Sequence, residues 1–255
     1  MDLELRDRAY LITGGSDGLG LALARRLVEE GAGVAVCGRD EDRLTQARAL
    51  LGTDALCVSA DVTNADQLDA FVDATLAKFG RLDGVVNNAG RSSATAIATS
   101  SDDAWREDYE LKVIAALHLI RRTLDALEST SGAVLNVLAI LARAPAARST
   151  PTAASRAAGL AMTKALAAEV GPRGIRVNAL LIGLIESGQW VRRAAEAGVE
   201  LDTFYERMAA SSNIPLGRLG RAEEFADVAA FLLSPRASYL TGIGVSVDGG
   251  LSPVI

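Results

Sequence analysis

The sequence predicts one doubly wound α/β domain, in which helices cover both faces of a parallel sheet of seven strands. Short apolar runs alternate with helix-like stretches along all 255 residues. The strands are continuously apolar, which is typical of strands buried on both faces of a parallel sheet. No linker-like segment or internal repeat divides the chain, so we expect residues 1–255 to form a single domain.

The individual elements follow from hydrophobic periodicity and from the turn residues between them. The expected strands are Ala9–Thr13, Gly33–Gly38, Ala55–Ala60, Leu82–Gly90, 132–140, Gly174–Ile182 and 242–247. The expected helices are Leu19–Glu30, Glu41–Leu51, Ala65–Phe79, Trp105–Leu127, Thr152–Val170, a helical segment from about Glu186 to Ser211, and Ala222–Leu233. In the first helix, Leu19, Leu23 and Leu27 recur on one face, which predicts an amphipathic helix packed on the sheet.

Composition and charge exclude several classes of protein. The 32 acidic and 26 basic residues give a net charge of −6 without a basic stripe, so nucleic acid is not expected as a partner. The first residues carry acids where a signal peptide carries bases, and their apolar run is too short to span a membrane. We therefore expect a cytoplasmic protein that does not bind membranes. One histidine and two cysteines make a metal site improbable.

The segment Thr13–Gly20 (TGGSDGLG) directly follows the first strand and opens the first helix. Glycines at positions 14, 18 and 20 permit a tight turn, the close approach of a pyrophosphate, and close packing of the helix on the strand. The free N–H groups at the start of the helix attract negative charge. This context predicts a dinucleotide site.

Further blocks extend this pattern along the chain, and with them the sequence resembles the short-chain dehydrogenase/reductase family. These blocks are Asp61-Val62, Asn87–Gly90 (NNAG), Gly174–Asn178 (GIRVN) and Asp248–Gly250. The resemblance covers essentially the whole length and implies a Rossmann fold that binds a nicotinamide cofactor. The residues that it assigns to cofactor binding are Gly14, Ser16, Gly18, Leu19, Gly20, Arg39, Asp61, Val62, Asn88, Ala89, Gly90, Arg156, Gly183 and Ser187.

The end of the second strand decides between the two nicotinamide cofactors. An acid at position 38 would bind the ribose 2′-hydroxyl of NAD, but the chain has Gly38 followed by Arg39. The guanidinium of Arg39 could hold a 2′-phosphate, which favours NADP(H). Asp17 points the other way, because its charge would lie near the same phosphate, so NAD(H) remains the alternative.

The catalytic positions depart from the family pattern. Relatives use an asparagine, a serine, a tyrosine and a lysine, but this chain has Lys112, Ala139, Thr152 and Arg156 at the matching positions. An aliphatic hydroxyl titrates far above the range useful for acid–base catalysis, and an arginine stays protonated. Ordinary ketone reductase or alcohol dehydrogenase activity is therefore not expected.

Three functions fit this pattern. The first is an enzyme that binds NADP(H) and acts on a small molecule by a non-standard mechanism, either reduction without the tyrosine and lysine or a redox-neutral dehydration, isomerisation or cyclisation. The second is a silent subunit that pairs with an active paralogue, and the third is a dinucleotide-sensing scaffold. The segment 186–211, which folds over the substrate in relatives, remains long enough to act as a lid and favours the enzyme.

Two expectations concern ligands and partners. Lys112 and Arg156 would together favour an anionic ligand, unless Lys112 turns away or pairs with an acid such as Glu110 or Glu186. The helices 105–127 and 152–170 form the main subunit interface in relatives, so we expect a homotetramer or a homodimer.

Overall fold

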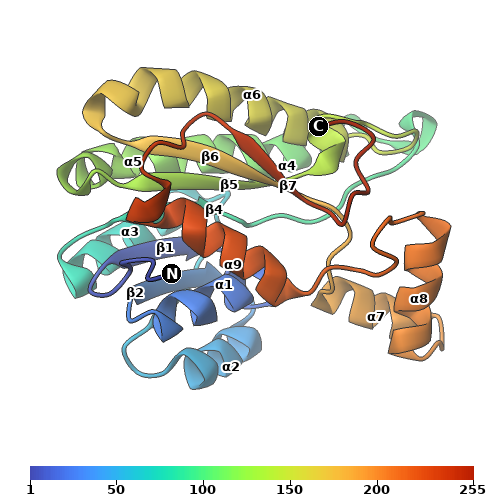
Figure 1. The fold of residues 1–255 in the computed structure, drawn as a ribbon, viewed down its shortest axis with the longest axis horizontal. Coiled ribbons are helices and arrows are strands. Elements are labelled where there is room, and N and C mark those ends of the chain that lie inside the picture. Colours follow the sequence, from blue (N-terminus) through green and yellow to red (C-terminus); the bar gives the residue numbers. More distant parts are fainter.

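The computed structural model describes residues 1–255 and confirms the expected doubly wound sheet (Figure 1). Its seven strands are all parallel, in the order β3-β2-β1-β4-β5-β6-β7. The strands are β1 (Ala9–Thr13), β2 (Gly33–Gly38), β3 (Leu56–Ser59), β4 (Gly84–Asn87), β5 (Ala133–Ala139), β6 (Arg176–Ile182) and β7 (Gly244–Val247). The strand order reverses between β1 and β4, and ligands of such sheets bind beyond the carboxyl ends of the strands at this point.

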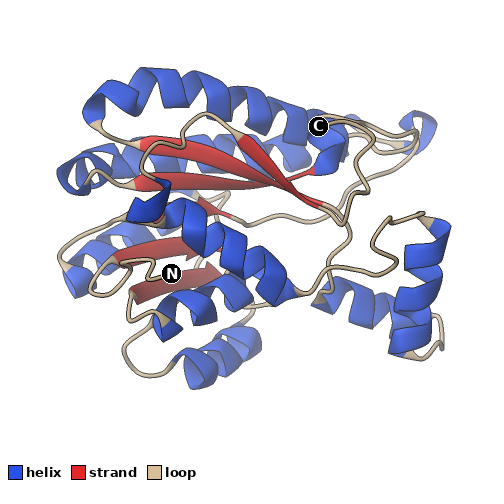
Figure 2. Cartoon of the chain, viewed as in Figure 1, coloured by secondary structure: helices blue, strands red, loops and turns tan.

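Helices cover both faces of the sheet, as Figure 2 shows. They are α1 (Gly18–Glu29), α2 (Glu41–Leu51), α3 (Ala65–Phe79), α4 (Asp102–Tyr109), α5 (Ala115–Thr130), α6 (Thr152–Val170), α7 (Gly188–Glu196), α8 (Leu201–Ser211) and α9 (Ala222–Leu233). Leu23 of α1 and Phe225 of α9 are buried in one core. Phe71 of α3, Leu119 of α5 and Val170 of α6 are buried in the other. None of the helices combines the length and the apolar character that a bilayer crossing requires.

Two expected helices differ in the structure. The helix expected over Trp105–Leu127 begins at Asp102 and is interrupted by a π turn at Glu110–Ile114, so the expectation of one regular helix was wrong. A π turn accommodates one extra residue, and such turns occur frequently at functional sites. The helical segment from about Glu186 to Ser211 divides into α7 and α8, which stand to one side of the layers, at the right of Figure 1.

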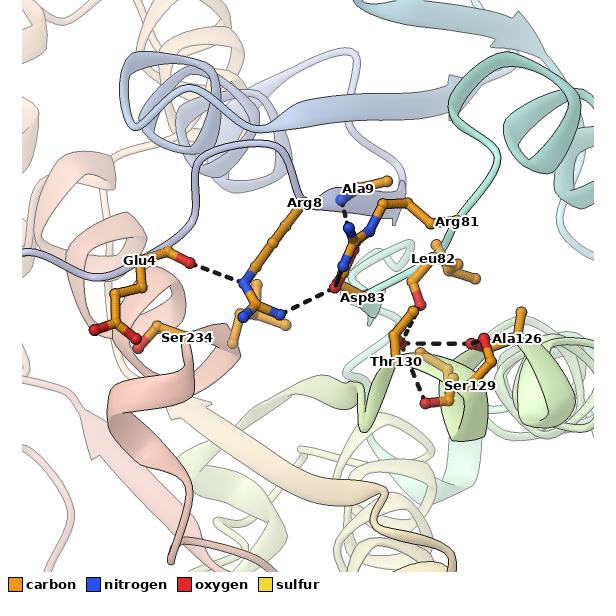
Figure 3. A network of polar contacts seen from close by, with 12 residues as sticks. Glu4, Arg8, Ala9, Arg81, Leu82, Asp83, Ala126, Ser129, Thr130 and Ser234 are labelled. Carbon is orange, nitrogen blue, oxygen red and sulfur yellow. Dashed lines mark hydrogen bonds and ion pairs between the residues drawn. The ribbon is translucent and has the colours of Figure 1, made fainter.

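A buried carboxylate fixes the amino ends of the central strands (Figure 3). Asp83 lies just before β4, and its carboxylate accepts hydrogen bonds from the backbone N–H of Ala9 (2.9 Å) and from Arg8 Nη1 (3.0 Å). Arg81 adds two hydrogen bonds of 2.7 Å each. This network lies at the opposite end of β1 and β4 from the predicted dinucleotide turn.

Candidate active site at the carboxyl ends of the strands

The glycine turn has the geometry that its sequence predicts. Gly14 and Gly18 adopt positive φ angles of 64° and 54°. A Cβ at Gly20 would lie 2.4 Å from the carbonyl oxygen of Gly14, so only glycine fits there. A Cβ at Gly18 would meet a single atom within 4 Å, the Cβ of Ser187, so the space in front of this part of the turn is open. This cradle at the start of α1 fits a pyrophosphate group.

The NNAG segment braces the turn from the neighbouring strand. Asn88 Nδ2 donates to the carbonyl oxygens of Thr13 and Gly14, at 2.9 Å each. The hydroxyl of Thr13 accepts from the backbone N–H groups of Asn88 and Ala89, at 3.1 Å each. These contacts across the β1–β4 boundary hold the turn in place without help from a ligand.

The adenosine end carries more positive charge than the sequence alone indicated. The side chain of Arg39 is 69% exposed and lies 3.4 Å from Asp61 Oδ2. Asp17 caps α1 by accepting from the N–H of Gly18, and its carboxylate pairs with Arg43 of α2 at 3.2 Å. Arg43, in the first turn of α2, was not among the predicted site residues. It pairs with both Asp17 and Asp40, at 3.2 and 3.3 Å, which weakens the objection that Asp17 raises to a 2′-phosphate near Arg39.

The Asp61 carboxylate is held in its charged form. Partial burial acts to raise its pKa, but hydrogen bonds from the backbone and hydroxyl of Thr63, together with Arg39, outweigh burial and lower it. A carboxylate that stays ionised here can accept hydrogen bonds from a ligand.

Ser16 explains the glycine at the end of β2. A Cβ at Gly38 would lie 2.5 Å from the Ser16 hydroxyl oxygen. A side chain at position 38 would therefore require the Ser16 side chain to move out of its place beside the glycine turn. The local packing thus disfavours the NAD-type acid at this position.

Lys112 does not present a free cation to the site. Its side chain is fully buried in the π turn, and Nζ lies 2.5 Å from Asp108 Oδ1 and 3.2 Å from Thr152 Oγ1. Lys112 therefore pairs with an acid, as in the second of the two expectations, and that acid is Asp108 rather than Glu110 or Glu186. Asp108 and Lys112 are four residues apart, where helical side chains meet, and this spacing could have identified the pair.

The Lys112–Asp108 pair belongs to a larger buried network. Asp108 Oδ2 accepts a hydrogen bond of 2.6 Å from the Ser155 hydroxyl, so each carboxylate oxygen has a partner. Thr152 Oγ1 accepts a second hydrogen bond, of 2.9 Å, from the backbone N–H of Ser93. Such a network is stable in a low-dielectric interior only when its members are satisfied by hydrogen bonds.

The surroundings change the acidity of Lys112. Burial is the main cause, and the charge of Arg156 adds to it; together they lower the pKa of the Lys112 ammonium from 10.5 to about 8. Asp108 opposes both, because its hydrogen bond and its charge favour the ammonium. An amine with this pKa can exchange a proton close to neutral pH.

Arg156 lies one turn after Thr152 on α6 and contacts the NNAG segment. Its Nη1 donates to the carbonyl oxygen of Val137 at 2.5 Å, and a Cβ at Gly90 would lie 2.8 Å from Nη2. Burial lowers the pKa of Arg156 to about 10, so the guanidinium is charged at neutral pH. Its buried Nε has no hydrogen-bond partner within the protein.

A small cavity adjoins these side chains. It has a volume of about 20 Å³, enough for about one water molecule, and its lining includes Asn87, Asn136, Lys112 and Arg156. The cavity is therefore small, and Lys112 at its wall is paired with Asp108 rather than free to bind an anionic ligand. Ala139, at the end of β5, contributes no polar group.

The predicted residues thus fall into two groups along one edge of the sheet. The cofactor positions are in the glycine turn, at the ends of β2 and β3, in the NNAG segment, and after β6 at Gly183 and Ser187. The four catalytic positions meet around the first turn of α6 and the end of β5. Sequence reasoning missed Asp108 and Ser155, which hold Lys112 in place.

Comparison with known proteins identifies relatives over the whole chain. Residues 14–252 match the family model described as enoyl-(acyl carrier protein) reductase. A 3-oxoacyl-[acyl-carrier-protein] reductase of Chlamydia pneumoniae is 33% identical, with 99% of this chain and 100% of the relative covered. An L-fucose dehydrogenase of Bos taurus is 34% identical over 98% of this chain and 91% of the relative.

Solved structures match equally well. A short-chain oxidoreductase of Pseudomonas aeruginosa with NADPH bound, described as containing an atypical catalytic centre, is 39% identical with a TM-score of 0.91 over 97% of this chain and 98% of that one. An L-sorbose reductase of Gluconobacter frateurii complexed with NADPH and L-sorbose is 32% identical, with a TM-score of 0.94 over 100% of both chains. A 3-ketoacyl-(acyl-carrier-protein) reductase of Brucella melitensis, complexed with NADH, is 31% identical, with a TM-score of 0.87 over 98% of this chain and 100% of that one.

Proposed function

Because the chain belongs to the short-chain dehydrogenase/reductase family, we propose that it is an NADP(H)-dependent oxidoreductase. Its substrate is a small organic molecule, reduced at a carbonyl group or oxidised at the corresponding alcohol. The proposal rests on the contrast between the part of the site that would bind the nucleotide and the part that would transfer a proton. The nucleotide half has the residues and the open cradle that a dinucleotide needs, whereas the proton-transfer half is built from Lys112, Asp108 and Thr152.

In this proposal the nucleotide lies along the carboxyl ends of the strands. The turn around Gly14 and Gly18 holds the pyrophosphate, and Asp61 accepts from the adenine amino group. Arg39 holds the 2′-phosphate, with Arg43 offsetting the charge of Asp17. Arg156, whose guanidinium lies beside Gly90, would contact the nicotinamide ribose. When bound, the cofactor supplies or accepts the hydride.

NADP(H) is the preferred form for two reasons on this chain. Gly38 cannot be replaced by an acid without displacing Ser16. Two arginines, at positions 39 and 43, lie at this end of the site, where they pair with Asp61, Asp17 and Asp40 through contacts of 3.2 to 3.4 Å. The P. aeruginosa and G. frateurii structures hold NADPH, whereas the B. melitensis structure holds NADH, so the family fold accepts both forms.

The substrate half differs from that of an ordinary reductase. Without a tyrosine, ordinary ketones should turn over slowly, because general acid–base catalysis contributes about 10²–10⁴-fold. A carbonyl activated by a neighbouring electron-withdrawing group accepts a hydride more readily than an ordinary ketone, so its reduction depends less on a strong proton donor. The P. aeruginosa relative, described as having an atypical catalytic centre, supports a departure of this kind.

The segment of α7 and α8 is proposed as the lid over the substrate. It follows the carboxyl end of β6, and Arg192 of α7 lies 4.0 Å from Asp17 at the glycine turn. Trp190, Tyr205 and Met208 are partly buried and pack against a small cluster of Ala209, Ile214 and Leu219. These apolar side chains favour a substrate with an apolar portion next to its reacting carbonyl.

Calorimetric titration of the purified protein with NADPH and with NADH tests the proposal. We expect binding of NADPH at least tenfold tighter than that of NADH. Stopped-flow mixing of the NADPH complex with a panel of simple and activated ketones then measures hydride transfer directly. Absence of binding to either nucleotide would overturn the proposal in favour of a silent subunit, and binding without transfer to any carbonyl would favour a dinucleotide-sensing scaffold.

A further inference from the structure

We infer that Thr152 is the catalytic group that protonates the reacting oxygen, and that Lys112, positioned by Asp108, restores the proton to Thr152. The inference rests on the proposed function and names the proton donor that the altered site requires. It assigns a role to a buried ion pair that is not needed to bind the nucleotide.

The hydrogen bonds of Thr152 leave its hydroxyl able only to donate. A hydroxyl group has two acceptor lone pairs and one O–H donor. The Ser93 N–H occupies one lone pair at 2.9 Å, and Lys112 Nζ occupies the other at 3.2 Å. No acceptor within the protein takes the Thr152 O–H, so its proton is free for a ligand oxygen.

The position of Thr152 directs this proton toward the substrate. Thr152 is the first residue of α6, and Arg156 follows it on the same face one turn later. Arg156 contacts the NNAG segment and lies at the proposed nicotinamide ribose. Ser93 belongs to the loop that continues from the same segment. The hydroxyl therefore lies between the first turn of α6, which carries Arg156, and the loop that continues from the NNAG segment.

Lys112 is suited to supply the second proton. Its ammonium is charged, yet it is fully buried, and it faces Asp108 from α4, Arg156 from α6 and Arg91 from the loop after β4. Burial and the two arginines favour loss of the proton, and Asp108 limits that loss. Asp108 is itself fixed by the Ser155 hydroxyl at 2.6 Å, so Nζ is held against Thr152.

The proposed reduction transfers one hydride to the carbonyl carbon and one proton to its oxygen. A bound dihydronicotinamide supplies the hydride that adds to the carbonyl carbon, and the electron pair of the C=O bond moves to the oxygen. That oxygen forms a bond to the Thr152 hydroxyl proton, while Thr152 Oγ1 takes a proton from Lys112 Nζ. Lys112 is left as a neutral amine and regains a proton from water through the small cavity that it lines.

Isosteric variants test the roles of the two side chains. With NADPH and an activated ketone, Thr152→Val and Lys112→Met should each lower kcat by about 100-fold or more, whereas Thr152→Ser should retain most of it. The kcat for reduction should fall above pH 8 in the unmodified enzyme and should lose this dependence in Lys112→Met. Thr123→Val is the matched control, because Thr123 is a buried threonine that bonds only to backbone carbonyls of its own helix.

A measurement that does not depend on turnover uses the small number of lysines. The chain has three, Lys78, Lys112 and Lys164, so ¹³Cε labelling of lysine gives a simple NMR spectrum. In the protein without cofactor, we expect Lys112 to titrate near pH 8, about two pH units below the ordinary lysine value. In Thr152→Val it should titrate lower still, because the ammonium loses an acceptor. A Lys112 signal that titrates at the ordinary lysine pKa would overturn the inference.

The outcomes separate this inference from the proposed function. If NADPH and NADH both fail to bind, the proposed function is wrong, and the NMR titration still decides whether Lys112 is an acidic ammonium coupled to Thr152. If NADPH binds and Thr152→Val turns over at the rate of the unmodified enzyme, the oxidoreductase stands and Thr152 is not the donor.

Discussion

Lys112 is a fully buried ionisable group at the candidate site. Lys112 brings a buried charge that needs a counter-ion, and Asp108 supplies it at 2.5 Å. The pair has an acidic proton within hydrogen-bond reach of Thr152. The candidate site thus has an ionisable group next to the Thr152 hydroxyl.

The titration of Lys112 makes the stability of the fold depend on pH. Its pKa is about 8 in the folded protein and 10.5 when unfolded, so between these values the unfolded chain binds the extra proton and stability rises with pH. The difference corresponds to about 3 kcal/mol. We expect the free energy of unfolding of the unmodified protein to rise by up to this amount, relative to Lys112→Met, from pH 7.5 to 10.5. Urea unfolding at several pH values measures the difference, and a constant difference across the range would contradict it.

Arg39 is expected to select the cofactor. Its guanidinium is exposed and pairs with Asp61 through one long contact, so it can turn to a 2′-phosphate at little cost. Arg39→Asp should reverse or abolish the preference for NADPH, because the new carboxylate repels the phosphate and can accept from a ribose hydroxyl. Calorimetry with both nucleotides checks this. Arg48→Asp, which makes the same change of charge on α2, is the control. Equal affinities of the parent protein for the two nucleotides would contradict the role of Arg39.

At the scale of elements, the candidate site depends on the residues at which α1 and α6 begin and on the π turn at Glu110–Ile114. The glycine turn sets the start of α1, and Pro151 precedes the first turn of α6, which carries Thr152. The π turn brings Lys112 inward beneath that turn. The groups that differ from the family pattern are therefore held by secondary structure, and they are as rigid as the nucleotide cradle.

The strands and the dinucleotide turn could be predicted from the sequence because their signals are local. Thr13–Gly20 has its glycines at fixed offsets within eight residues, and each strand is an apolar run. The network around Lys112 could be predicted only in part. Its pairing with Asp108 follows from a spacing of four residues, but Ser155 approaches from a helix 47 residues away. The widening of the helix at Glu110–Ile114 has no clear signal in the periodicity.

The anchor at Asp83 provides an independent prediction for the amino ends of the strands. Its buried carboxylate accepts hydrogen bonds from two arginines and from the N–H of Ala9. Asp83→Ala should lower the free energy of unfolding by about 3 kcal/mol, because it leaves two arginines without their partner. Cofactor affinity should stay unchanged, since the glycine turn lies at the other end of the same strands. Thermal unfolding and calorimetry measure the two quantities, and a loss of affinity with unchanged stability would contradict this separation.

At the scale of the whole molecule, one face of α6 lacks a partner within the chain. Its outer side is exposed and consists largely of alanines. They lie at positions 157, 161, 165 and 168. Ile114, at the end of the π turn, is also 46% exposed. Small side chains let two helices approach closely, so we propose that copies of the chain associate through α5 and α6 into a dimer or a tetramer.

Light scattering tests this association in solution. At micromolar concentration we expect a mass of two or four chains for the parent protein. Ala161→Arg should lower that mass, because a long charged side chain would be forced between closely packed helices. Ala49→Arg is the matched control, since Ala49 is an exposed alanine on α2, away from the proposed interface. The control should leave the mass unchanged, and it should show that an added arginine by itself does not alter association. A parent protein with the mass of a single chain would mean that the outer face of α6 is a solvated surface.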